Sequence, residues 1–394
     1  MRVTNSMLVS TLKRNLNGNL TRMDRLQNQM ATGRKFAHIS DDPISLIYGQ
    51  SARNRISRLN DFQRSVQSAQ DWLIQAEDGL MEMQRTFVHA YEAAVDAAND
   101  PKGTGSEADK RNIAPIIAQL RDNILDTLNS TFGDRFVFSG YNTPCDPTSN
   151  LSDQRVRAFT VEGNPPSLFL NGFNLSQFDG MNAQDYHDLF VAIDISGLDN
   201  NAAQAAILTA FGFTADVAGV AAFNNDPRFT AQGITLDAAV TMHRLMYDVL
   251  TFDVGPGISM PVTINGADVA MFMTPDENGV MVMRNAWNVM QELYERVDAG
   301  LPAEEIGRMI KPLQDAQNHL LTKTAEIGGR VRRLELLESR YEQDAINYER
   351  MRSDAEDVDM AEVIIHLKMA EAIYQASLSA GARIIQPTLM DFLR

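Results

Sequence analysis

The sequence contains a single cysteine, Cys145, in 394 residues, so neither a disulfide nor a thiolate-rich metal site can form within one chain. We expect Cys145 to be an ordinary packed residue. No apolar run of about 18 residues is present, which excludes a transmembrane helix. The first twenty residues contain neither a continuous apolar segment nor a small-residue cleavage site, so we expect no secretory signal peptide.

Positive charge is also scarce, because 35 basic residues face 51 acidic ones and the formal net charge is −16. A strongly acidic chain is repelled by nucleic-acid phosphates and by anionic lipid surfaces. We therefore expect neither a nucleic acid nor a membrane among its partners.

Motifs for catalysis, metals and cofactors are absent from the sequence. The six histidines are scattered and form no H-E-x-x-H or similar metal spacing. No phosphate-binding loop, nucleophile elbow or dinucleotide fingerprint occurs. We predict that the protein is not an enzyme and has no catalytic, metal or cofactor site. The Met-rich segments, Trp72 and Trp287 are interpreted as packing residues.

Apolar residues at steps of three and four predict three helical segments in the N-terminal part of the chain. The first thirty residues carry one stripe, and residues 45–98 carry a stripe long enough for a coiled-coil strand. A third helix is expected from Ser106, a candidate N-cap, with Pro115 as a kink or a later start. The alternation of Phe136 and Phe138 predicts a short strand.

The remaining chain predicts an insert followed by a second set of long helices. We divide it into an assembly helix and joint (1–42), a first rod half with a β-hairpin end (43–144), a β-rich insert (145–283), a second rod half (284–352) and a C-terminal assembly helix (353–394). Asn-Gly pairs at 171–172 and 265–266 predict hairpin turns. Helix is also expected at 183–193, 235–250 and 303–350.

These segments predict a mainly α protein. The N- and C-terminal regions are expected to form a long antiparallel helical rod or coiled coil, with an α+β domain inserted at its tip. A helix of more than forty residues is roughly 60 Å long. This plan is typical of an assembly subunit rather than an enzyme.

The stretch "QMATGRKFAHISDDPISLIYGQ", residues 29–50, interrupts the first two helices. Asp41 and Asp42 are adjacent, so on a helix they would not face one another as a catalytic pair. An Asp before Pro43 is instead a good N-cap, since Pro suits the first helical position. Gly33 suits the end of the preceding helix. We interpret Gly33, Asp41, Asp42 and Pro43 as the caps of a helix–loop–helix joint.

Four segments, in this order, resemble the bacterial flagellin family: "QMATGRKFAHISDDPISL", "TFGDRFVFSGYNT", "EIGGRVRRLE" and "QASLSAGARIIQPTLMDFL". The resemblance covers residues 1–145 and 283–394 and leaves the insert unmatched. The second and fourth segments are most similar to the family's junction members, which link the flagellar hook to its filament. Two departures from the family's pattern are Ala31-Thr32-Gly33, in place of the commoner Ser-Gly turn, and the Arg135-Phe136 pair that precedes Phe138.

Membership would imply a structural subunit of the extracellular flagellum, secreted through the flagellar type III apparatus without a cleaved signal. Its implied partners are the first hook-associated protein, flagellin, neighbouring copies of the chain and an export chaperone in the cytoplasm. The alternatives are a flagellin filament subunit and, in a different class, an adhesion or glycan-binding protein that acts through its insert.

The terminal stripes are the expected assembly interface. An isolated amphipathic helix is marginal in water, so residues 1–40 and 355–394 are expected to order when subunits meet, pairing with one another. A charge at Leu16 or Leu367 is expected to stop incorporation and leave the rod folded. The predicted interface residues are Val9, Leu12, Leu16, Leu20, Met23, Val363, Leu367, Tyr374 and Leu378.

Overall fold

The structure is a computed structural model that describes residues 5–36, 42–99, 106–133, 135–140, 157–188, 198–211, 213–230, 234–247 and 249–385. Cys145 and Asp41 lie outside these residues. The chain divides into two compact units, one of residues 1–63 with 339–394 and the other of residues 64–338. The division falls inside two long helices rather than at the joints near residues 42 and 353.

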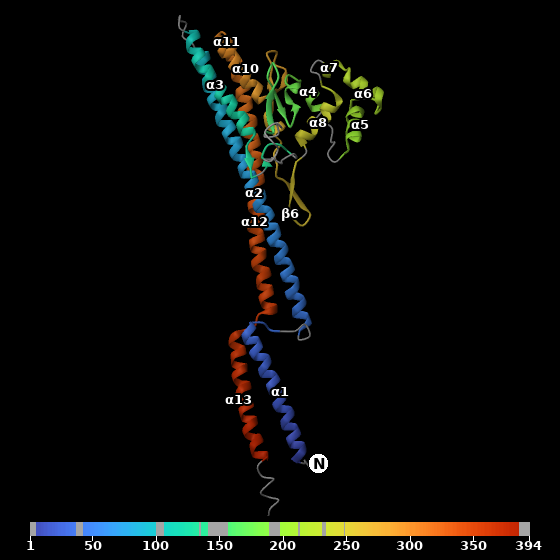
Figure 1. Cartoon of the computed structure of the whole chain (residues 1–394), viewed down its shortest axis with the longest axis vertical. Helices are drawn as coiled ribbons and strands as arrows, with labels where there is room; N and C mark the ends of the chain where they lie inside the picture. The colour runs from blue at the N-terminus through green and yellow to red at the C-terminus, as the bar shows by residue number, and fades with distance from the viewer. Residues whose placement is uncertain are drawn as a thin grey trace, which may run out of the picture. The chain divides into compact units, whose positions relative to one another are not determined.

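The first unit consists of helices from both ends of the chain. α1 (Asn5–Thr32) and α13 (Met360–Ile385) lie side by side (Figure 1). The start of α2 (Pro43–Ala98) meets the end of α12 (Ile310–Glu356). The Phe62 and Tyr341 rings stack with centroids 6.1 Å apart, and the Arg55 guanidinium lies 5.3 Å from the centre of the Tyr348 ring.

The two long helices bury the apolar stripes that their spacing predicts. On α2 of the second unit the stripe is almost fully buried over more than four heptads. Its buried members are Val66, Ala69, Leu73, Ala76, Leu80, Met83, Phe87, Ala90, Ala94 and Ala97. On α12 the buried members are Leu313, Ala316, Leu320, Ile327, Leu334 and Tyr341. Trp72 and Trp287 are buried packing residues, as expected.

A helix begins at Ser106 as expected, whereas the segment expected as one helix at 303–350 is divided. α3 (Ser106–Leu128) runs through Pro115, which neither restarts nor ends it. The segment expected as one helix at 303–350 is a short α11 (Ala303–Gly307) followed by α12, which extends to Glu356. α10 (Ala286–Asp298) precedes them, and Gly300 takes a positive φ of 66° at the break between α10 and α11.

Among the described residues of the second unit, four small antiparallel sheets lie in the middle of the sequence. They are formed by β1 (Thr131–Phe132) with β2 (Arg135–Phe136); by β3 (Phe159–Glu162), β4 (Ser167–Leu170) and β5 (Phe173–Asn174); by β6 (Thr251–Gly255) with β7 (Ile258–Pro261); and by β8 (Met271–Pro275) with β9 (Met281–Asn285). The protein is thus mainly helical, with small sheets in its middle region.

The insert contains more helix than its composition predicts. Helices occupy most of residues 200–247, so this part of the insert supplies much of the helix of the expected α+β domain. They pack around three stacked or edge-on rings, Phe211, Phe223 and Phe229. The short elements are η1 (Leu175–Phe178), α4 (Ala183–Tyr186), α5 (Asn200–Ala210), α6 (Val217–Asn224), α7 (Pro227–Thr230), α8 (Leu236–Tyr247) and α9 (Gly266–Ala270).

One of the two expected Asn-Gly hairpin turns is confirmed and the other is wrong. Asn171 and Gly172 both have positive φ, 51° and 81°, and join β4 to β5. Asn265 instead caps α9, where its side chain accepts from the Ala267 N–H. Asparagine suits both roles, and here tertiary packing decides: a Cβ on Gly266 would collide with the Phe138 carbonyl.

The segment around Phe138 is buried on every side rather than alternating as a strand. β2 ends at Phe136, and Val137, Phe138 and Ser139 that follow are all buried. The Phe138 ring fills the space left by Gly79, whose Cβ would approach it to 2.9 Å. The alternation prediction fails because this segment packs inside the unit rather than lying on a sheet surface.

The outer side of β3 is bonded to an asparagine side chain. Asn129 Oδ1 accepts from the Phe159 N–H at 2.8 Å, and Asn129 Nδ2 donates to the Phe159 carbonyl at 2.9 Å. The side chain therefore takes the place of a neighbouring strand residue at this point of the edge.

Candidate functional site

The seam between α1 and α13 is made of one face of each helix. Val363, Leu367 and Ala370 are buried on α13. A Cβ on Gly381 would come within 2.6 Å of a Leu12 methyl group, so the two helices approach closely at this level. The seam is antiparallel, and it brings the two ends of the chain together as the sequence predicts.

The seam repeats every 3.5 residues, which changes some of its predicted members. On α1 the half-buried positions include Asn19 and Gln29, while Leu20, 40% exposed, points away. On α13 the half-buried Ser377 takes the place expected for Leu378, which is 46% exposed. The other predicted positions face the partner helix: Val9, Leu12, Leu16 and Met23 are half-buried, Val363 and Leu367 are buried, and Tyr374 is half-buried.

α13 carries more apolar surface than α1 covers. Ile365, Met369 and Ile373, each four residues apart, form a second stripe and are 61%, 54% and 43% exposed. Exposed alanines extend this stripe towards the C-terminal end of the helix. A helix that is apolar on several sides is typically buried on several sides, so this stripe is a candidate contact surface of the unit.

The joint at the end of α1 is hydrogen-bonded to the break between α12 and α13. Gly33 ends α1 with a φ of +69°, which favours glycine, and its carbonyl accepts from the Val358 N–H at 3.0 Å. The Lys35 N–H donates to the Glu356 carbonyl at 2.7 Å. The ends of α1 and α12 are therefore held together by backbone bonds.

The Glu356 side chain lies inside this joint and is 5% exposed. Its carboxylate pairs with the Arg53 guanidinium on α2. It also occupies the space beside Gly49, where any Cβ would overlap the carboxylate. We call Gly33, Lys35, Gly49, Arg53 and Glu356 the clasp, since they connect α1, α2 and α12.

Asp42 begins α2 as an N-cap. Its Oδ1 accepts from the backbone N–H of Ile44 and of Ser45, both at 3.1 Å, and Pro43 is the first helical residue. The hydroxyl and the backbone N–H of Ser45 lower the pKa of Asp42. The neighbouring Asp41 lies outside the described residues.

We expect Asp42→Asn to remove the acid sensitivity of the start of α2. A carboxyl whose folded-state pKa is lowered stabilises the fold above its ordinary pKa, and this stabilisation is lost as the pH falls through the folded pKa. Asparagine caps a helix without titrating. Hydrogen exchange of the first turns of α2, corrected for intrinsic rates, should show acid-induced opening in the parent chain and little in the variant. Equal acid dependence in both would contradict the role of Asp42.

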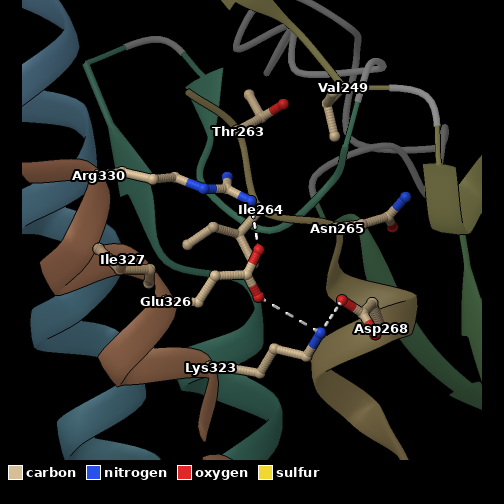
Figure 2. Close-up of a pocket in the computed structure, with 9 residues that line it drawn as sticks. All are labelled: Val249, Thr263, Ile264, Asn265, Asp268, Lys323, Glu326, Ile327 and Arg330. Atoms are coloured by element: carbon tan, nitrogen blue, oxygen red, sulfur yellow. Dashed lines mark hydrogen bonds and ion pairs between the residues drawn. The ribbon is translucent and has the colours of Figure 1, made fainter. Parts of the chain in front are cut away.

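A separate cavity of about 330 Å³ lies in the second unit between α12 and the segment leading into α9. Figure 2 shows four alternating charges along it: Lys323 pairs with Asp268 and Glu326, and Arg330 meets Glu326 at 2.5 Å. Each charge has a partner, and their formal sum is zero. The arrangement fastens α9 to α12 and offers no net charge to a ligand.

His319 lies on α12 near the same segment. Its Nε2 is 2.7 Å from the Asp268 carbonyl, and burial lowers its pKa, so a neutral ring that donates to this carbonyl fits the geometry. Within the described ranges, no group of three His, Cys, Asp or Glu side chains is placed to hold a metal ion. Among the same residues, no helix combines the length and apolarity needed to cross a membrane.

Residues 3–143 match the bacterial flagellin N-terminal helical region. The N-terminal third of the chain is therefore similar to this region of the bacterial flagellins. The matched part contains α1, the joint, α2, α3 and the Phe138 segment.

Two curated relatives of this chain are named flagellar hook-associated protein 3. The protein from Escherichia coli K12 is 27% identical over 157 residues, which are 40% of this chain and 49% of the relative. The protein from Salmonella typhimurium LT2 is 26% identical over 148 residues, 37% of this chain and 46% of the relative. The chain thus spans about half the length of the curated relatives it matches.

The fold is similar to a solved structure of a flagellar hook-associated protein from Vibrio parahaemolyticus. The TM-score is 0.51 at 14% identity, with 80% of this chain and 100% of that chain covered. At this identity the similarity concerns the fold alone.

Sequence reasoning missed the clasp and the second stripe of α13. Arg53 and Glu356 are 303 positions apart, and nothing local marks them as partners. The second stripe did carry a signal, because Ile365, Met369 and Ile373 follow helical spacing one face away from the chosen stripe.

Proposed function

We propose that this chain is a structural subunit of the bacterial flagellum that forms the junction between hook and filament. The observation that carries this proposal is the apolar surface of α13 beyond the part that α1 covers. Exposure of such a surface to water is unfavourable, and other helices that bury it lower the free energy, as in an assembly built from many copies. The relatives named flagellar hook-associated protein 3 support the flagellar setting.

The proposed partners are the first hook-associated protein on one side, flagellin on the other and neighbouring copies of the same chain. A junction needs two different end surfaces, so its contacts are heterologous rather than self-complementary. The protein would be secreted through the flagellar export apparatus, with a chaperone in the cytoplasm, and would act outside the cell. Its role is not enzymatic.

Seeded polymerisation tests the proposal. Purified chain is added to hook–basal bodies that carry the first hook-associated protein, flagellin follows, and each stage is imaged by electron microscopy. We expect a short zone that stops growing and then supports filament growth. Long filaments of this chain alone would identify a filament subunit, and failure to bind hook ends would reject the junction role.

A further inference from the structure

We propose that Glu356 and Gly381 are specificity determinants that allow α1 and α13 to pair in a single register. The register of the two helices decides which face of α13 remains exposed. The importance of the register for assembly rests on the proposed function, but the existence of a single register does not depend on that function. The two residues act at opposite ends of the helix pair.

Gly381 fixes the far end through its contact with Leu12. In an antiparallel pair, two residues are level when they lie at the same height along the helix axes. A step of four residues towards the C-terminus of one helix is matched by a step of four residues towards the N-terminus of the other. Leu16 is therefore level with Ser377, and Asn19 is nearly level with Tyr374. Large side chains on one helix face small ones on the other at these levels.

A slip of one helical turn breaks this size complementarity. Met23 is level with Ala370 in the observed register and would become level with Tyr374 if α1 moved one turn along α13. Two large side chains would then meet in a seam that brings a Leu12 methyl group within 2.6 Å of where a Cβ on Gly381 would lie. Overpacking of this kind destabilises the displaced register.

Glu356 fixes the near end through the clasp. The ten residues from Gly33 to Asp42 join α1 to α2, and ten extended residues span up to roughly 33–36 Å. One helical turn advances about 5.4 Å, so this link alone would permit a slip of several turns. Two backbone bonds remove that freedom, because the Lys35 N–H donates to the Glu356 carbonyl and the Val358 N–H donates to the Gly33 carbonyl, which ties the end of α1 to the end of α12. The ion pair with Arg53 holds Glu356 against α2 and so keeps its carbonyl in place for Lys35.

Disulfide trapping in the full-length chain, with Cys145→Ser as background, tests the register. The level pair is Met23→Cys with Ala370→Cys, and the displaced pair, which matches the slip described above, is Met23→Cys with Tyr374→Cys. Disulfide formation needs Cα atoms within about 7 Å, so we expect the level pair to form at least about fivefold faster under mild oxidation. Gly49→Ala, which displaces the Glu356 carboxylate, should bring the two rates close together.

Gly18→Ala is the matched control, since no atom lies within 4 Å of a Cβ at Gly18 and the rate ratio should not change. If Gly49→Ala lowers helix content by circular dichroism, Glu356→Gln replaces it, because it keeps the side-chain volume while removing the charge paired with Arg53. Similar rates for both cysteine pairs with the clasp intact would overturn the proposal. An unchanged ratio of the two disulfide-formation rates in the clasp variant would also overturn the proposal.

The seeded assembly assay separates this inference from the proposed function. A single register in a chain that never joins hook ends would reject the junction role and leave the register determinants standing. A chain with a loosened register that still builds normal junctions would show that register does not govern assembly.

Discussion

Met369→Asp is expected to abolish incorporation at the hook–filament junction while leaving the α1–α13 pair folded. Met369 is more than half exposed on the second stripe of α13, so a charge there remains in water in the free chain. Burying a side chain of this size stabilises an interface by about 1.5–3 kcal/mol, whereas burying an unpaired carboxylate costs several kcal/mol. The change recurs in every copy, so the loss should be complete in the seeded assembly assay.

The matched control is Gln375→Asp, which introduces the same charge at an exposed polar position of the same helix. We expect it to assemble normally. Circular dichroism of both variants should match the parent chain. Normal junctions built from Met369→Asp would show that the second stripe is not an interface.

The structure changes the expected effect of a charge at Leu16 or Leu367. Both residues face the seam within one chain, and Leu367 is buried there. A carboxylate in this seam would weaken the helix pair before any partner binds, so these substitutions test folding and assembly together. Met369→Asp tests assembly separately from folding, because Met369 lies on the exposed second stripe and not in the seam.

Phe138→Ala is expected to destabilise the second unit by about 3–5 kcal/mol, the usual cost of deleting a buried phenylalanine ring. The ring is fully buried and fills the space left by Gly79. Both tryptophans of the chain, Trp72 and Trp287, belong to this unit. Urea unfolding followed by tryptophan fluorescence therefore reports on this unit rather than on the terminal helices.

Phe132→Ala is the control for that measurement. Phe132 is a partly exposed ring in the β1–β2 hairpin, which precedes Phe138. The centroids of the Phe132 and Trp72 rings lie 5.9 Å apart in an edge-to-face arrangement. Its loss should cost about 1 kcal/mol, in line with an aromatic pair. A similar small effect for Phe138→Ala would mean that its pocket collapses without penalty.

Long helices and their buried faces could be predicted from the sequence because apolar residues repeat every 3.5 positions over many turns. On α2 the periodic signal is strong enough that Leu73, Leu80 and Phe87 are all buried as expected. On α1 the signal is weaker. Leu20 and Asn19 are adjacent, and hydrophobicity favours Leu20, but the seam spacing selects Asn19.

The rest depends on contacts between residues distant in sequence. Asn265 followed by Gly266 fits a hairpin turn or a helix cap equally well by local chemistry, and the close approach of Phe138 and Phe159 decides in favour of the cap. Glu356 lies in a run of polar residues whose composition predicts a solvated linker. Its burial follows from Gly49 and Arg53, which only the folded chain brings beside it.

The asparagine on the edge of β3 has a consequence for the proposed role of the chain in an assembly of many copies. Subunits that await assembly at high concentration can also associate through free strand edges, which leads to disordered aggregates or amyloid. By bonding to both backbone groups of Phe159, Asn129 interrupts the template that another chain would need. The fold thus discourages an unwanted route of polymerisation at this edge while its terminal helices keep the intended one open.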